Sequence, residues 1–336
     1  MKKIVGFLLC LIVFAISPTL HAKTPPELLG AVENIYAANF GAARSIIGAY
    51  VAAHPDQPYG YLLRGISSEW HQLVNNKGSS LDAAIMADYE KARQLAEAEL
   101  EKDPGNLEKK VDLSNALIYV AKKQIDQGHK VQAGATLKRA SSQVQDVIER
   151  NPDHSEACFS IGLFNYFADN VPSGFKWLAA ILGFHGDRNK GLAYIQKAAS
   201  APSLTQGDAR FMLSYIYSQK EGRYDQALIY ATQLFNRYPA NPIFIFDYSE
   251  MLFRTKKVVD ARANFSKFFD YCTTHKGSCA QKYEYLANYF MAWSYMDEKN
   301  FTGAKKYLDK AIELDTKKYK DRTADLDKWK TLIVGN

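Results

Sequence analysis

Apolar residues recur every three or four positions through long stretches of the chain, as they do on one face of an α-helix. The segment from Leu81 to Glu101 combines this spacing with residues that favour helix by intrinsic propensity. No stretch of alternating β-branched residues is long enough for a strand. The pattern therefore predicts an all-α protein with almost no sheet.

The helical pattern itself repeats in the C-terminal half of the chain. Tyr224 and Ala227 precede a helix that ends at Pro239, and Val258 and Ala261 occupy the same places 34 residues later. A period of 34 residues is the length of one helix-turn-helix unit of the tetratricopeptide repeat.

The last unit carries the residues of that repeat most clearly. It places small, aromatic and apolar residues where the repeat has them: Met291-Ala292, Tyr295, Phe301, Ala304, Leu308 and Ala311. Small residues let two antiparallel helices approach closely, and the larger side chains fill the space between them. On these residues the chain resembles the tetratricopeptide repeat (TPR) superfamily, although Asn288 replaces the usual tryptophan and Thr316 the closing proline. The resemblance implies an α-solenoid of helix pairs.

We expect residues 23–336 to form one such solenoid of six or seven helix pairs. Its clearest repeats span residues 208–242, 243–271 and 284–316. No Pro/Gly/Ser-rich linker divides the chain into independent domains.

An apolar segment at residues 171–184 interrupts the repeats, and we expect it to be an inserted helix. It contains Phe175, Trp177 and Phe184, with Lys176 as its lone charge. Residues 171–199 resemble the tetratricopeptide repeat protein 39 family, which implies a shared architecture and no activity. A lid, a core element and a membrane contact all remain open as roles for the inserted helix.

A glycine-rich stretch follows the inserted segment. A phosphate-binding loop needs Lys and then Ser or Thr after its last glycine, whereas Leu192 follows Gly191. We therefore expect Gly191 to be the small residue at a helix crossing. Asp187 and Arg188 are expected to cap a helix and to pair locally.

The N-terminus has the pattern of a signal peptide. Lys2 and Lys3 precede an apolar run from Ile4 to Ile16, and the small residue Ala22 follows. The apolar run is about thirteen residues long, shorter than the roughly 20 that span a membrane. We expect residues 1–22 to be removed, and the mature protein to be periplasmic or secreted.

Three cysteines remain in the mature chain. Cys272 and Cys279 flank a short loop rich in Thr, Gly and Ser, so we expect them to form a disulfide in an oxidising compartment. Two free thiols are the alternative. Cys158 lies in an apolar helical stretch, where burial as a small hydrophobic residue is expected.

Charge and composition narrow the function. The chain has 42 basic and 36 acidic residues without a dense basic block, which argues against a nucleic-acid partner. Its seven histidines are scattered without the spacing of metal ligands, so we expect them at the surface and predict no metal or cofactor. No nucleophile motif is present, and we expect no enzyme.

The first helix of each pair lines the concave face of a TPR array. Aligning the last three units places these residues on that face: Phe211, Tyr215, Phe246, Glu250, Arg254, Tyr289 and Trp293. Phe211 and Phe246 suit the core equally well. Tyr215, Tyr289 and Trp293 are the better candidates for a binding groove, because each combines a flat apolar face with a polar atom.

These observations favour an exported, non-catalytic scaffold whose concave groove holds an extended or helical segment of a partner protein. The alternative is an envelope protein that binds a membrane surface or an apolar ligand through residues 171–184. The single charge of that segment, Lys176, favours the scaffold over the membrane contact.

Overall fold

The computed structural model describes residues 25–75, 78–169, 186–275, 279–315 and 320–334. This part of the chain contains fifteen α-helices, one π-helical turn and no strand, so the prediction of an all-α solenoid is confirmed.

The helices follow one another as seven antiparallel pairs, in line with the six or seven expected. The first helices of the pairs are α1 (Pro26–Tyr36), α3 (Pro58–Val74), α5 (Leu107–Asp126), α7 (Ser155–Asp169), α10 (Gln206–Tyr215), α12 (Pro242–Arg254) and α14 (Gln281–Asp297). The second helices are α2 (Phe40–Ala53), α4 (Asp82–Lys102), α6 (Lys130–Arg150), α9 (Arg188–Ser200), α11 (Tyr224–Arg237), α13 (Val258–Thr274) and α15 (Phe301–Leu314). The π-helical turn (Ile216–Lys220) extends α10, and α16 (Lys320–Val334) follows the last pair.

Local sequence signals fix where several helices begin. Proline occupies the first turn of α1, α3 and α12, where its missing N–H costs no hydrogen bond. The side chains of Asn106, Asp187, Asn241 and Asn300 accept hydrogen bonds from backbone N–H groups at the starts of α5, α9, α12 and α15. The predicted capping role of Asp187 is therefore confirmed.

The crossing of α7 and α9 depends on Gly191, as the sequence predicts. A Cβ at this position would lie 2.5 Å from the backbone nitrogen of Tyr166. Arg188 does not pair locally. Its guanidinium bonds to Glu221, whose nearly buried carboxylate also accepts a hydrogen bond from the Tyr166 hydroxyl at 2.6 Å. The expectation of a local pair was wrong. Glu221 is distant in sequence, but the fold brings the end of α10 next to the start of α9, where Arg188 lies.

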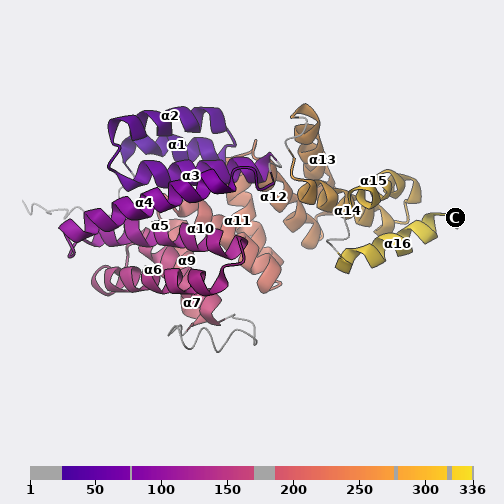
Figure 1. The fold of residues 1–336 in the computed structure, drawn as a ribbon. Coiled ribbons are helices and arrows are strands. Elements are labelled where there is room, and N and C mark those ends of the chain that lie inside the picture. The colour runs from indigo at the N-terminus through magenta and orange to yellow at the C-terminus, as the bar shows by residue number, and fades with distance from the viewer. Residues whose placement is uncertain (1–24, 76–77, 170–185, 276–278, 316–319, 335–336) are drawn as a thin grey trace, which may run out of the picture.

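The solenoid closes on itself between α1 and the start of α12. Tyr36 at the end of α1 packs against Tyr238 and Phe244, and its carbonyl accepts a hydrogen bond from the side chain of Asn241. Near this contact, Arg237 forms an ion pair with Glu33 at 2.7 Å. Helices α1 to α12 thus form one closed turn, and α13 to α16 project to one side of it (Figure 1).

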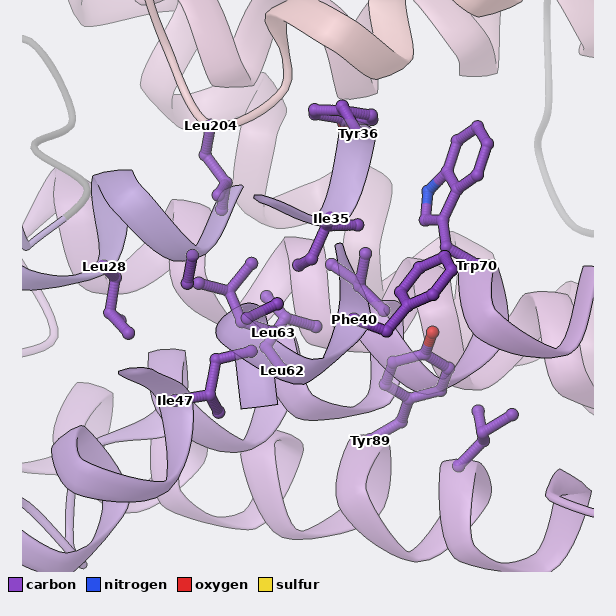
Figure 2. Packing of buried hydrophobic residues seen from close by; sticks show 14 of the residues in the cluster. Leu28, Ile35, Tyr36, Phe40, Ile47, Leu62, Leu63, Trp70, Tyr89 and Leu204 are labelled. Carbon is purple, nitrogen blue, oxygen red and sulfur yellow. The ribbon is translucent and has the colours of Figure 1, made fainter. Parts of the chain in front are cut away.

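The core of the first pairs lies between α1, α2 and α3. Figure 2 shows Leu28, Ile47 and Leu63 from these three helices within one apolar cluster. Leu204, from the segment before α10, joins the same cluster and extends it across the closed turn.

The cysteines and one histidine test further expectations from the sequence. Cys158 is fully buried, as predicted, and Cys272 is bonded to Cys279, which confirms the expected disulfide. The prediction that every histidine lies at the surface was wrong for His154, which is 2% exposed. Its ring Nδ1 accepts a hydrogen bond from the backbone N–H of Ala157 at the start of α7. This bond replaces one to water and so allows the ring to be buried.

Within the described part of the chain, no helix combines the length and the apolar character that a membrane span requires. The same residues contain no group of three or more histidine, cysteine or carboxylate side chains arranged to hold a metal ion.

Candidate binding cavity

A cavity of about 510 Å³ lies inside the closed turn. Its walls come from α3, α5, α7 and α10, the first helices of four consecutive pairs, with Gly78 and Ala280 contributed by neighbouring connections. First helices are the ones that face inward in a TPR array. Most of the wall is apolar and comprises Ile66, Trp70, Leu73, Ile118, Phe159, Leu163, Phe211 and Met212.

Trp70 anchors the aromatic side of the cavity. Its ring centroid lies 5.6 Å from those of Tyr36, Phe211 and Phe244, which come from α1, α10 and α12. Contacts at this distance and tilt are favourable for aromatic pairs. The cavity wall and the closure of the solenoid therefore share the same rings, and a change at one alters the other.

One acid of the cavity wall is Asp208, which is half-buried in the first turn of α10. Its Oδ2 accepts a hydrogen bond from the Tyr119 hydroxyl at 3.0 Å, and the Tyr36 hydroxyl also donates to this carboxylate. Burial raises the pKa of Asp208, while the two hydroxyl donors act in the opposite direction by stabilising the charged form. Asp208 is thus held in place by neutral donors.

A second carboxylate, Glu69 of α3, lies on the same wall but has a cationic partner. Lys122 Nζ lies 2.6 Å from Glu69 Oε2, and the Tyr89 hydroxyl donates to the same oxygen at 3.2 Å. Lys123 also lines the cavity, with its ammonium 2.8 Å from Asp82 and 3.6 Å from Asp126. Both lysines of the wall are therefore already paired.

From the wall of the cavity, a chain of polar groups leads to a fully buried acid. Ser160 donates to Asn115 Oδ1 at 3.3 Å, and Asn115 donates to Glu156 Oε2 at 3.2 Å. Glu156 is 0% exposed, and burial raises its pKa to about 8. Loss of contact with water also raises the pKa of Asp112, to about 7. Burial therefore favours the protonated form of both acids.

The model of the family Iml2/Tetratricopeptide repeat protein 39 matches residues 118–317, which is more than half of the chain. This chain belongs to that family. The match confirms the resemblance to the TPR superfamily, and it extends well beyond residues 171–199, whose sequence resembles tetratricopeptide repeat protein 39.

Solved structures with some likeness to this family member include TPR proteins from two bacteria. The one from Thermus thermophilus is 18% identical, with a TM-score of 0.39 over 67% of this chain and 97% of that chain. The one from Parabacteroides merdae is 14% identical, with a TM-score of 0.35 over 92% and 97%. Yeast Tom70 is 15% identical, with a TM-score of 0.40 over 84% and 68%. No curated protein matches the sequence.

Apart from Phe211, the groove candidates taken from the last three repeats of this TPR family member do not line the cavity. Tyr215 lies at the end of α10 with 41% of its surface exposed, and its ring contacts Lys220. Phe246 is buried in the C-terminal core, which is the core role that its position also allowed.

Glu250, Arg254, Tyr289 and Trp293 do lie close together, but Glu250 and Tyr289 are buried, whereas Arg254 and Trp293 are half-buried. Glu250 is 6% exposed and Tyr289 is 3% exposed, so neither forms an open groove surface, contrary to expectation. Arg254 pairs with Glu250 at 3.4 Å and lies over the ring of Trp293.

The reason for this burial is α16. The Tyr289 hydroxyl donates to Asp325 Oδ2 of α16 at 2.7 Å, and the ring of Trp329 lies 5.3 Å from Tyr289 and 6.5 Å from Trp293. The helix thus occupies the place of a further first helix. The repeats identified in the sequence end at residue 316, before this helix begins.

The cavity residues were missed because the alignment used the units whose period is clearest. Of the expected groove residues only Phe211, which the sequence left open between core and groove, lines the cavity. A usable signal was present: on α5 and α10 an aromatic and a charged residue stand three positions apart, as Tyr119 with Lys122 and Asp208 with Phe211. Such pairs share one helix face.

Two groups of predictions lie outside the described residues. They are the signal peptide of residues 1–22 and the inserted segment with Phe175, Trp177 and Phe184.

Proposed function

We propose that this protein is an exported, non-catalytic scaffold that binds a segment of a partner protein and seats one anchor side chain of that segment in the central cavity. The TPR fold supports a role in protein interaction, and the pattern of residues 1–22 supports export.

The cavity is the observation that carries the proposal. Its volume of about 510 Å³ falls within the range of about 300–1,000 Å³ found for ligand pockets. Concave, mostly apolar pockets with a few polar groups are the usual sites where proteins bind ligands. The cavity is open to solvent on one side and walled by Trp70, Phe159 and Phe211, so an apolar group of another molecule can enter it and bury its surface there.

The chemistry of the wall suits an anchor residue better than a reaction. Apolar and aromatic side chains surround a few fixed polar groups, as in the pockets that receive the central residue of a protein interface. Glu69 and both lysines are engaged in ion pairs within the protein.

The proposal is tested by filling the cavity. Ile118 lines it and is partly exposed to it, so Ile118→Trp should occupy the space that the anchor needs. Ile229→Trp is the matched control, because Ile229 is 55% exposed on the second helix α11 and does not line the cavity. Both variants should melt near the wild-type temperature by circular dichroism.

Binding is measured by affinity capture from the native envelope followed by mass spectrometry. The wild-type chain and Ile229→Trp should retain the same stoichiometric partner, and Ile118→Trp should lose it. Retention of that partner by a folded Ile118→Trp variant would contradict the use of the cavity.

A further inference from the structure

The charges around the cavity do not balance within the protein. Lys122 pairs with Glu69, and Lys123 pairs with Asp82 and Asp126. Asp208 accepts hydrogen bonds from hydroxyl groups, and no lysine or arginine among the described residues forms an ion pair with it. Lys122 acts on Asp208 from a distance and lowers its pKa, but the ion pair of Lys122 is with Glu69. Among the described residues, one carboxylate of the wall is therefore left without an ion pair of its own.

This carboxylate retains the capacity to bind a further donor. A carboxylate has about four acceptor sites on its two oxygens. The hydroxyls of Tyr119 and Tyr36 use part of that capacity and fix the direction of the group. A charged donor that enters the cavity would find an oriented acceptor in surroundings of low dielectric constant, where attraction between opposite charges is stronger than in water.

The aromatic wall favours the same sign of charge. Phe211 lies on α10 one turn after Asp208, and the ring of Trp70 lies 5.6 Å from it. Ring faces attract cations, tryptophan most of all. An anionic anchor would meet Asp208 and Glu69 while both lysines are engaged elsewhere.

We propose that the anchor accepted by this cavity is a cation at the end of an apolar stem, such as a lysine or arginine side chain of the partner segment, and that Asp208 is its counter-ion. This inference rests on the proposed scaffold function and names the chemistry of its occupant. The stem lies against Trp70 and Phe211, and the ammonium or guanidinium group donates to the Asp208 carboxylate.

Three small probes with one stem and different charges test the inference on the full mature chain. They are 4-phenylbutylamine, which is cationic at neutral pH, the neutral 4-phenylbutanol and the anionic 4-phenylbutanoate. Dissociation constants are measured by calorimetry or by ligand-observed NMR. Because a hydrogen bond to a charged group is stronger than one between neutral groups, the amine should bind at least about tenfold more tightly than the alcohol.

Two substitutions assign that preference to its residue. Asp208→Asn keeps the shape and the acceptor for Tyr119 but removes the charge, so it should abolish the preference for the amine. Asp247→Asn is the control, because Asp247 is also a partly buried acid that accepts from a hydroxyl, that of Ser214 at 2.6 Å, but it does not line the cavity. It should leave the preference unchanged.

Binding of the three probes by the wild-type chain tests the inference even if Asp208→Asn fails to fold. Equal binding of the three probes, absence of binding by the amine, or tightest binding of the carboxylate would each overturn the inference. If that happens while Ile118→Trp still loses the protein partner, the scaffold function stands and only the charge of its anchor is wrong. If the amine is preferred but Ile118→Trp keeps the partner, the cavity binds a cation and the scaffold proposal fails.

Discussion

The side-chain amide of Asn241 donates a hydrogen bond to the backbone carbonyl of Tyr36 at 2.8 Å, across 205 residues of sequence. The other side-chain atom, Oδ1, accepts a hydrogen bond at 2.9 Å from the backbone N–H of Ile243 in the first turn of α12. Asn241 is fully buried, so both bonds are shielded from water. One residue thus starts a helix and joins the two ends of the closed turn that surrounds the cavity.

Asn241→Ala should destabilise the protein more than the loss of an ordinary helix cap. It removes a cap and leaves the buried Tyr36 carbonyl without its donor, for a combined cost of about 2–4 kcal/mol. Asn300→Ala is the matched control, because Asn300 caps α15 through Gly303 at an exposed position and should cost about 1 kcal/mol. Urea unfolding of both variants measures the difference. Equal losses would show that the bond to Tyr36 adds nothing to stability.

Two glycine substitutions should change stability in opposite directions, because Gly191 lies at the close crossing of α7 and α9 whereas Gly48 lies at an open position. Gly191→Ala would place its Cβ 2.5 Å from the backbone nitrogen of Tyr166, so the two helices must separate, at a cost of about 1–3 kcal/mol or more. Gly48→Ala, in the middle of α2, meets nothing within 4 Å and should stabilise by up to about 1 kcal/mol through helix propensity. Thermal melts should show a lower midpoint for Gly191→Ala and a higher midpoint for Gly48→Ala than for the wild type. A neutral Gly191→Ala would refute the close crossing.

Burial of Glu156 predicts that stability falls as the pH rises. Its pKa is about 8 in the folded protein, whereas a glutamate in an unfolded chain titrates near about 4.3. Between these values the folded state holds a proton that the unfolded state has released. The stabilisation is therefore complete below about pH 4 and is lost progressively up to about pH 8, by at most about 1.4 kcal/mol per pH unit.

Glu156→Gln removes this proton linkage while it keeps an acceptor for Asn115. Its free energy of unfolding should decline less between about pH 5 and about pH 8 than that of the wild type. A residual slope is expected from Asp112, whose pKa of about 7 is raised in the same direction. Denaturant titrations at several pH values provide the measurement, and identical slopes for variant and wild type would count against a buried, protonated Glu156.

The disulfide predicts the thiol content of the mature chain. With Cys272 bonded to Cys279, labelling of unfolded but unreduced protein that lacks residues 1–22 should detect one thiol, that of Cys158. The bond closes a short loop, so its reduction should cost only about 2 kcal/mol. Cys158→Ser should then give no label. Three labels in the wild-type chain would mean that the bond does not form.

The parts of the architecture that depend on neighbouring residues were predictable. The helix pair around Tyr224 and Ala227, the cap at Asp187 and the crossing at Gly191 each follow from residues within one or two repeats. Such features are set by hydrophobic spacing, capping chemistry and side-chain size, which a sequence displays directly.

The sequence predicted that the first helices of the pairs would form the binding surface, but it did not predict which repeats would form it. That first helices line the inner face could be inferred from the repeat, and Phe211 was among the residues considered. The burial of Tyr289 could not be inferred, because it depends on where α16 packs, and the repeats identified in the sequence end before that helix.

The sequence by itself determined that this protein is a TPR solenoid, which residues pair its helices and which helices face inward. Only the tertiary structure decided that the solenoid closes and that a cavity with Asp208 on its wall results. The reason is that curvature accumulates from a small rotation at each repeat, so the meeting of Tyr36 with Asn241 is a sum over many interfaces. No local pattern in the sequence records that sum.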